Sequence, residues 1–260
     1  MPASAGCPSL KRFHPRPDAR LRLFCFPWAG VGASAFYPWF RHLPDEIELT
    51  AVQYPGREDR LREPALRRPG PLVELLLRDL APHCDRPFAL FGHSMGAMVA
   101  FELARRLPSA GRPAPGHLFV SGRQAPQRPE PMAPIPDLPD AEFVAELQRR
   151  YGGVPEAIAH DPAVRAIFLP TIRADLELTF AYGYEHGPAL ACGISAFGGT
   201  EDQIPREQLD DWRAQTTGAF RLHLLAGDHF FIAVQTEEVV RRVTEDLRAA
   251  FPQQLPAHGP

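Results

Sequence analysis

The sequence predicts an α/β fold, with a mostly parallel central sheet flanked by helices. Six short apolar runs alternate with amphipathic segments along its 260 residues. The runs are apolar at successive positions rather than at every second one, which is typical of strands covered on both faces. Helices on both sides of a sheet provide such cover, so a helix–sheet–helix arrangement follows.

The elements can be placed in order. The predicted strands are 21–26, 47–53, 88–92, 117–122, 193–199 and 220–227. A leucine-rich amphipathic stretch over 71–84 predicts a helix between the second and third strands. The last helix is predicted over 236–251, with Thr236 as its N-cap and two acidic residues in its first turn.

Residues 124–187 break the alternation. This region opens with the proline-dense "APQRPEPMAPIPDLP" and contains no evident strand. Two helical patterns follow, one over 140–153 with Asp140 as the expected N-cap and one over 161–182. We interpret the region as a helical insertion, since helices without an intervening strand do not fit a βαβ succession. An ordinary stretch of the helical layer is the alternative.

Composition narrows the classes of function. The formal net charge of -3 lacks the one-signed field that nucleic-acid or membrane-surface binding uses, so neither partner is expected. The first twenty residues lack a signal-peptide apolar core and no run is long enough to span a membrane, so a cytoplasmic location is expected. The four cysteines form no C-x-x-C pair, and we expect neither a metal site nor a disulfide framework.

The stretch "ALFGHSMGAMVAFE" places Ser94 between two glycines. The pattern G-x-S-x-G arises by chance in about one protein of this length in ten, so alone it is weak. Here it lies between a predicted strand and a predicted helix, which is the context of a nucleophile elbow. Ser94 is therefore the candidate nucleophile.

A nucleophilic serine needs a base and an acid that orients it, and hydrolases with such an elbow supply the acid first. Asp202 follows the predicted strand 193–199, with Glu201 as the adjacent competitor. His229 follows the last predicted strand, whereas His223 lies inside that strand and His258 in a proline-rich tail. A loop aspartate or histidine is usually a turn former or surface residue, but the order and placement together favour a triad. His93, next to the serine, is interpreted as a packing residue.

An oxyanion hole needs backbone N–H groups near the serine. Met95, at the start of the following helix, should supply one. The other should come from "FPWAGVGAS" (26–34), after the first predicted strand. A plain glycine-rich turn is the alternative, and a phosphate loop is disfavoured because neither G-x-G-x-x-G nor a P-loop lysine is present.

Several motifs together resemble one family. These are "FPWAG", "VQYPGREDRLREP", "FGHSMGAMVAFELA", "IPDLPDAEFVAELQRRYGGVP", "LPTIRADLEL", "AFGGTEDQIP" and "GDHFF". From about Arg20 to Phe251 the sequence is similar to the type II thioesterases that accompany polyketide and non-ribosomal peptide synthases.

This resemblance implies an α/β-hydrolase core over 1–123 and 188–260, with 124–187 as a helical lid. It implies hydrolysis of the thioester between an acyl group and the phosphopantetheine arm of an acyl or peptidyl carrier protein, which removes stalled or aberrant units. The family's nucleophile matches Ser94, its acid Asp202, its base His229, and its oxyanion donors the N–H groups of Met95 and Ala29. No cofactor is implied, because the substrate carries the phosphopantetheine, and a monomer is expected.

Two positions depart from the family pattern. Many relatives have His or Tyr where Trp28 stands, and a second Gly where Val31 stands. Because valine tolerates positive φ poorly, we expect the oxyanion loop to follow a different local path, with Trp28 and Val31 beside the substrate chamber or its entrance.

The charged "GREDR" (56–60) is either a solvated loop or a segment that orders the entrance of the active site. Carrier docking suggests arginines near that entrance, and Arg123 and Arg128 are candidates. Other functions also stay open: a thioesterase that releases medium-chain fatty acids, a carboxylesterase or acyltransferase, and a non-enzymatic binding scaffold.

Overall fold

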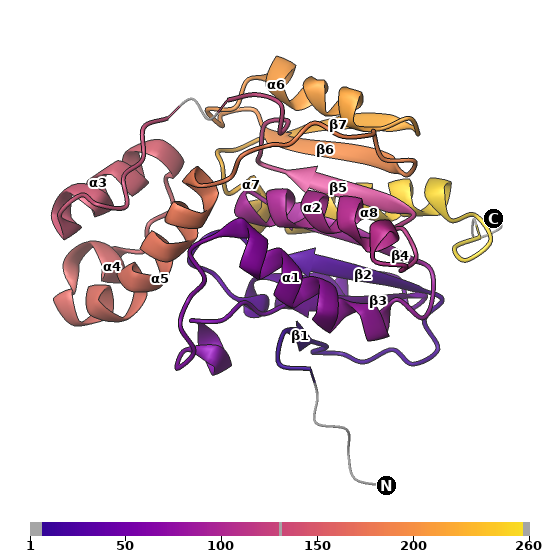
Figure 1. Cartoon of the computed structure of the whole chain (residues 1–260), viewed down its shortest axis with the longest axis horizontal. Helices are drawn as coiled ribbons and strands as arrows, with labels where there is room; N and C mark the ends of the chain where they lie inside the picture. The colour runs from indigo at the N-terminus through magenta and orange to yellow at the C-terminus, as the bar shows by residue number, and fades with distance from the viewer. Residues whose placement is uncertain (1–6, 130–131, 257–260) are drawn as a thin grey trace, which may run out of the picture.

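A seven-stranded sheet forms the centre of the protein. The computed structural model describes residues 7–129 and 132–256 (Figure 1). The strand order is β1-β3-β2-β4-β5-β6-β7, and all neighbours are parallel except β1 and β3. The strands are β1 (Leu10–Lys11), β2 (Leu21–Phe26), β3 (Ile47–Val52), β4 (Phe88–His93), β5 (His117–Ser121), β6 (Gly193–Gly199) and β7 (Phe220–Leu225). Six of them confirm predicted strands to within two residues; β1, with two residues, was not predicted.

Helices cover both faces of the sheet. In Figure 1, α1 (Pro69–Leu80) and α2 (Met95–Ser109) lie in front of it, and α8 (Thr236–Ala250) lies behind. The 3-10 helix η1 (Ala33–Arg41) packs beside α8. The remaining short helices of the core are η2 (Glu58–Arg60), η3 (Ala81–His83), α6 (Arg206–Asp210), η4 (Asp211–Gln215) and α7 (Phe231–Val234). This confirms the predicted α/β class.

Two apolar cores lie on opposite faces of the sheet, and β2 contributes apolar side chains to both of them. Phe24 and Phe26 belong to the core beneath α1 and α2, while Leu23 and Cys25 belong to the core beneath η1 and α8. Successive side chains of a strand point to opposite faces, so a strand buried on both sides needs no polar position.

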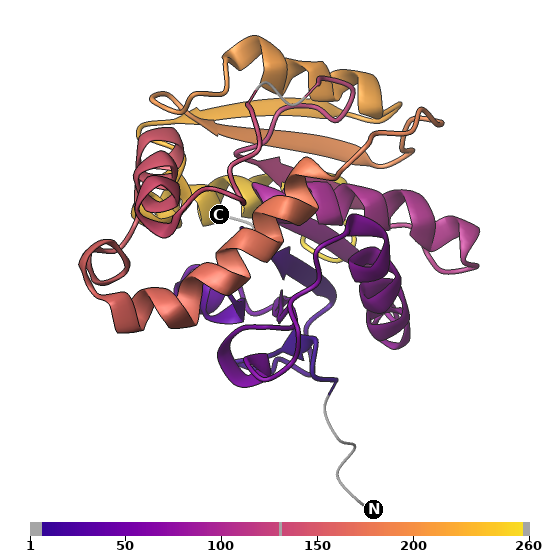
Figure 2. The ribbon, with the colours of Figure 1, turned by 60° about the vertical axis from the view of Figure 1, so that its left-hand side comes forward.

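The described residues between β5 and β6 form three helices. They are α3 (Asp140–Tyr151), α4 (Glu156–His160) and α5 (Pro162–Phe180), and residues 124–129 and 132–187 contain no strand. Figures 1 and 2 show them gathered beyond the carboxyl ends of the parallel strands. They share a separate apolar cluster, formed by Ile135, Phe143, Val144, Leu147, Ile158, Leu169 and Leu176. We refer to residues 124–187 as the lid segment; the division of the chain into core and lid stays a prediction.

Both predicted N-caps are wrong. Asp140 and Thr236 are the first residues inside α3 and α8, so neither has the extended backbone of a cap. Thr236 Oγ1 instead donates to the carbonyls of Ile232 and Ala233. In α5 the cap is Asp161, whose carboxylate accepts from the N–H groups of Ala163 and Val164.

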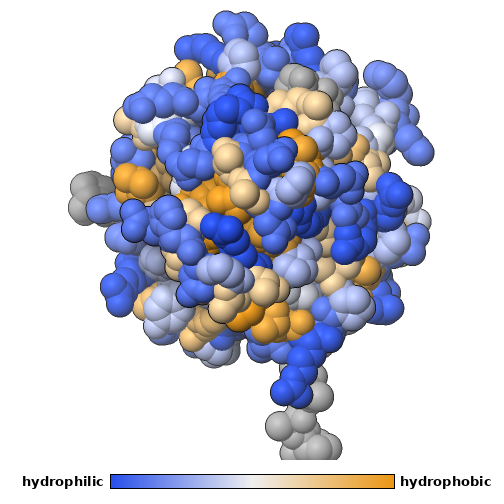
Figure 3. Space-filling model, turned by 90° about the vertical axis from the view of Figure 1, so that its left-hand side faces the viewer, coloured by the Kyte–Doolittle hydropathy of each residue, from blue (hydrophilic) through white to orange (hydrophobic). Residues whose placement is uncertain are grey.

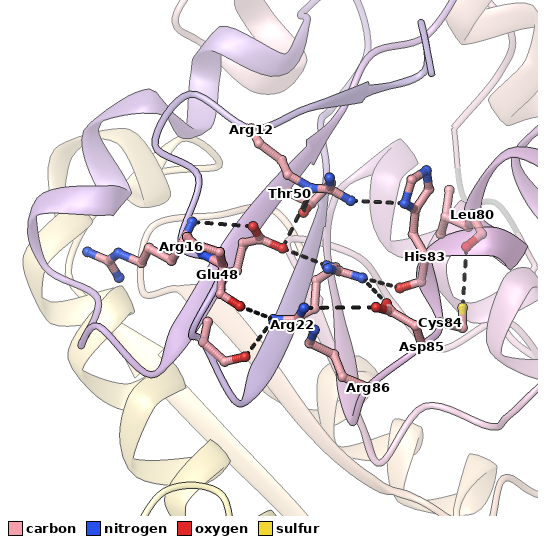
Figure 4. A network of polar contacts seen from close by, with 12 residues as sticks. Arg12, Arg16, Arg22, Glu48, Thr50, Leu80, His83, Cys84, Asp85 and Arg86 are labelled. Atoms are coloured by element: carbon pink, nitrogen blue, oxygen red, sulfur yellow. Dashed lines mark hydrogen bonds and ion pairs between the residues drawn. The ribbon is translucent and has the colours of Figure 1, made fainter. Parts of the chain in front are cut away.

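A buried ionic network ties the amino ends of β2, β3 and β4 together (Figure 4). Arg22 and Glu48 are both 4% exposed and face each other across β2 and β3, with Nε 2.8 Å from Oε2. Arg22 also bonds to Asp85 and to the carbonyl of His83, and Arg12 reaches Glu48 and His83. Removing one partner of such a buried pair costs about 3–5 kcal/mol, so the network favours the register in which Arg22 and Glu48 face each other, at the end of the sheet away from Ser94.

No helix in the described ranges 7–129 and 132–256 has the length and apolar character needed to cross a membrane.

Candidate active site

Ser94 lies at a sharp turn between β4 and α2. Its backbone has φ 52° and ψ −116°, a conformation that costs a residue with a side chain about 1–3 kcal/mol. The flanking glycines make the turn possible: a Cβ on Gly92 would lie 2.1 Å from the carbonyl oxygen of Gly96. The Ser94 N–H donates to the carbonyl of Ser121 at 2.7 Å, which ties the turn to β5. This is the strand–turn–helix context that the sequence predicts.

Asp202 and His229 come together beside the turn. Asp202 follows β6, His229 follows β7, and the distance from His229 Nδ1 to Asp202 Oδ2 is 2.9 Å. Both side chains are nearly buried, at 4% and 6% exposure. Ser94, Asp202 and His229 all line one cavity. No hydrogen bond joins Ser94 to His229 among the described residues, and such bonds commonly tighten only when substrate binds.

The other residues considered for the acid and the base do not form this pair. Glu201 is exposed, and His229 pairs with Asp202 instead. His223 Nε2 lies 2.8 Å from Asp246 Oδ2. His258 lies outside the described residues.

Aromatic rings hold the His229 imidazole. The ring centroids of Tyr151, from α3, and Phe230 each lie 5.3 Å from it, and that of His93 lies 5.1 Å away. His93 is fully buried, with Nδ1 2.9 Å from Ser121 Oγ. Burial, together with the nearby His229, lowers the pKa of His93 well below its ordinary value. His93 is therefore neutral and puts no positive charge beside His229.

The loop after β2 borders the same cavity. Trp28, Ala29 and Val31 all line it, and the Trp28 ring packs edge-on to His93 at 5.3 Å. The positive φ of this loop falls on Gly30, at 77°. In the described ranges only Glu58 and Ser94 are non-glycine residues with positive φ, so Val31 has an ordinary backbone. The expected strain at Val31 is therefore absent, while Val31 lines the cavity that also contains Ser94.

Two N–H groups near Ser94 have no acceptor within the described protein. Met95 is the first residue of α2 and is buried. Neither its N–H nor that of Ala29 donates to a backbone carbonyl or side chain in the part of the chain described. Met95 directly follows the serine, and Ala29 lines the same cavity as the serine. A carbonyl oxygen in the cavity could accept from them.

The cavity has a volume of about 1080 Å³ and lies between the core and the lid segment. Figure 3 shows apolar side chains recessed among hydrophilic ones on the face that carries the lid helices. Leu61, Ile167 and Phe168 line the cavity and are 45–52% exposed, so they mark its mouth. The deeper apolar wall comes mainly from the lid segment: Leu147, Val154, Ile158, Ile172 and Leu176.

The GREDR loop is not a solvated surface segment. Arg57 and Arg60 are 5% and 6% exposed, and Arg57 forms a two-fold ion pair with the buried Asp175 of α5. Sequence reasoning missed Asp175. Its only signal was one acidic residue in the otherwise apolar face of "IRADLEL".

A second serine, histidine and aspartate are hydrogen-bonded in the core. Ser195 Oγ donates to Asp246 Oδ2 at 2.6 Å and lies 2.9 Å from His117 Nε2. Because the hydroxyl proton is given to Asp246, His117 must donate to the serine and cannot act as its base. Ser195 is fully buried, and none of the three lines the cavity. This set is a structural network near the opposite end of the strands.

The parallel sheet, the serine elbow and the aspartate–histidine pair at the strand ends define an α/β-hydrolase. The thioesterase domain family model matches residues 21–247. The gramicidin S biosynthesis protein GrsT of Aneurinibacillus migulanus is 42% identical over 231 residues, which cover 88% of this chain and 90% of that protein. The medium-chain S-acyl fatty acid synthase thioesterase of Rattus norvegicus is 34% identical over 86% of both chains. The structure of the type II thioesterase BorB from the borrelidin biosynthetic cluster matches with a TM-score of 0.81 at 36% identity, covering 92% of this chain and 96% of that one.

The chain belongs to the thioesterase family, as the sequence motifs predict, and is similar over nearly its whole length to type II members.

Proposed function

We propose that this thioesterase hydrolyses acyl groups from the phosphopantetheine arm of acyl or peptidyl carrier proteins, and so clears stalled or aberrant units from a polyketide or non-ribosomal peptide synthase. Ser94 acts as the nucleophile, His229 as the base and Asp202 as the acid that orients it. The observation that carries the proposal is the Asp202–His229 hydrogen bond at 2.9 Å, beside the elbow serine on the wall of one large cavity.

The reaction follows from these positions. Ser94 Oγ attacks the thioester carbonyl while His229 takes the hydroxyl proton, and the N–H groups of Met95 and Ala29 stabilise the oxyanion. The C–S bond then breaks, and the leaving sulfur takes the proton from His229. A thiol with a pKa near 8.5 leaves with less acid assistance than an alcohol. Water, deprotonated by His229, attacks the acyl-serine ester, and Ser94 regains its proton as the acid leaves.

The cavity suits a long acyl thioester. Its volume of about 1080 Å³ slightly exceeds the usual range for small-molecule sites, about 300–1,000 Å³. The apolar lid wall would contact the acyl chain, and the exposed mouth formed by Leu61, Ile167 and Phe168 would receive the phosphopantetheine arm. No resident cofactor is needed for this chemistry.

The setting of the enzyme is also part of the proposal. We expect a cytoplasmic monomer that acts on a carrier protein rather than on nucleic acid or a membrane. Of the two arginines proposed for docking, Arg128 pairs with Asp211 at the surface and Arg123 lines the cavity. Arg128 therefore suits contact with a protein partner, and Arg123 suits contact with the bound arm.

A second candidate is the release of medium-chain fatty acids. The identity of 34% to the rat medium-chain thioesterase and the large volume of the cavity, with its apolar wall, favour it. The two functions differ in acyl preference, because an editing enzyme should accept short and branched units whereas a releasing enzyme should require a medium chain.

The test compares the rates at which the enzyme hydrolyses one short acyl group from a holo-carrier protein, from free pantetheine and from an oxygen ester. Fastest turnover of the carrier-linked thioester, lost in Ser94→Ala, supports the proposal. Ser109→Ala, at an exposed serine at the end of α2, is the matched control and should keep full activity. Equal turnover of the oxygen ester would indicate a general esterase. Turnover that begins only at medium chain length would indicate the fatty-acid alternative.

A further inference from the structure

Asp175 connects the lid segment to the loop after β2. It lies on α5, is 1% exposed, and uses both carboxylate oxygens. Oδ2 accepts the N–H of Gly30 at 2.7 Å and Arg57 Nη1 at 2.5 Å, while Oδ1 accepts Arg57 Nη2 at 2.8 Å. One buried carboxylate thus holds a lid helix, the GREDR loop and the residue after Ala29.

Arg57 is itself rigidly placed. Its Nε and Nη2 donate to the carbonyl of Pro55, its guanidinium lies 5.2 Å from the Tyr54 ring, and its carbonyl accepts from Gln53 Nε2 at 2.9 Å. The other end of the Gln53 amide accepts the N–H of Ala33 at 2.8 Å. The N–H groups of Gly30 and Ala33 therefore donate to Asp175 and Gln53, two side chains that Arg57 holds in place.

Glu58 holds the first turn of η1, which directly follows the same loop. Its carboxylate accepts the N–H and the hydroxyl of Ser34, at 3.2 and 2.5 Å. Glu58 has a positive φ of 48°, a strained conformation that persists only where surrounding contacts fix it. The GREDR loop thus contacts this region at two points. Arg57 pairs with Asp175, which accepts the N–H of Gly30, and Glu58 accepts the N–H of Ser34.

Helix α5 packs directly on this assembly. A Cβ on Gly30 would lie 2.6 Å from Ile172 Cγ1, so only glycine lets the helix approach this closely. Thr171 Oγ1 donates to the carbonyl of Gly56 at 2.7 Å. Contacts from α5 therefore contribute directly to the conformation of the loop after β2.

We propose that Asp175, neutralised by Arg57, is a positioning residue that sets the oxyanion hole through the N–H of Gly30. The peptide unit between Ala29 and Gly30 is planar, so fixing the Gly30 N–H fixes the orientation of the backbone next to the Ala29 donor. The ion pair also keeps a net negative charge away from the site where the oxyanion forms, since Arg57 balances the carboxylate. This inference rests on the proposed role of Ala29 and Ser94.

The experiment measures kcat and KM of full-length Asp175→Asn on hexanoyl-pantetheine, together with the affinity of a trifluoromethyl ketone analogue of the substrate. Asparagine keeps the shape but replaces one accepting oxygen with an NH2 group, which in either orientation faces a donor of Arg57 or Gly30. We expect kcat to fall 10- to 100-fold with KM within threefold, and the affinity for the ketone to fall by the same factor as kcat/KM. A loss of packing alone would not link these two quantities.

Glu177→Gln is the matched control. Glu177 lies on the same helix and pairs at the surface with Arg67, so kcat should stay within twofold. The double variant Arg57→Met/Asp175→Leu removes both charges. We expect it to fold stably without restoring kcat. A kcat for Asp175→Asn within twofold of the parent, recovery of kcat in the double variant, or a ketone affinity unchanged while kcat falls would each overturn the proposal. The small thioester keeps the test independent of carrier specificity, whose failure would affect only the proposed function.

Discussion

Gly96 lies where α2, which carries the proposed Met95 donor, contacts the end of β2 and the loop that carries the proposed Ala29 donor. A Cβ at this position would lie 2.1 Å from the carbonyl oxygen of Phe26 and 2.7 Å from that of Pro27. An ordinary C···O contact is about 3.3 Å, so Gly96→Ala must push the segments apart by about 1.2 Å. The neighbours are backbone atoms, which cannot rotate away. Displacement of a catalytic group by about 1 Å costs about 100-fold in rate, or about 2.7 kcal/mol, and we expect kcat to fall by at least this factor.

The assay follows release of pantetheine thiol from hexanoyl-pantetheine, with circular dichroism to measure folding and fluorophosphonate labelling to count reactive Ser94. Gly70→Ala is the control, because a Cβ at Gly70, near the start of α1, meets no atom within 4 Å. This variant should keep full activity, with stability unchanged or raised by up to about 1 kcal/mol. A folded Gly96→Ala enzyme with kcat within threefold of the parent would refute the reasoning.

Two further predictions concern stability and selectivity. Burial lowers the pKa of His117 to about 4, so the folded state binds fewer protons than the unfolded state between pH 4 and 6.5. The free energy of unfolding should therefore rise by up to about 3 kcal/mol across this range, and urea titrations of His117→Gln should show a smaller rise; parallel curves for the two proteins would contradict it. Val31→Gly removes a side chain from the cavity wall and should move the preferred acyl length in a series of acyl-pantetheines. An unchanged profile of kcat/KM against chain length would discard that role for Val31.

The sequence was sufficient for features that depend on local pattern. The strands 21–26 and 193–199 could be predicted because burial on both faces requires continuous apolar runs. The elbow and the two loop residues Asp202 and His229 could be placed because each directly follows such a strand. That placement brings them to one edge of the parallel sheet, where the structure shows them lining one cavity.

Features set by distant contacts were not predictable. In sequence, Arg57 and Asp175 are 118 residues apart, and the charges around Arg57 look the same as those of an exposed loop. The N-caps failed for a related reason: Thr236 has a capping side chain, but capping depends on backbone angles, which the preceding α7 sets. Strand β1 has two residues, too few for any periodicity to show.

The separate apolar cluster of the lid segment bears on how such an enzyme can diversify. The side chains that form the deep wall of the cavity are supported by α3, α4 and α5, whereas the serine, aspartate and histidine are supported by the two cores of the sheet. Substitutions in the lid can therefore reshape the chamber without disturbing the strands that hold the reacting groups. Selectivity for the acyl group and the machinery that cleaves it are thus free to evolve at different rates, except at contacts such as those of Asp175 and Tyr151, where the two meet.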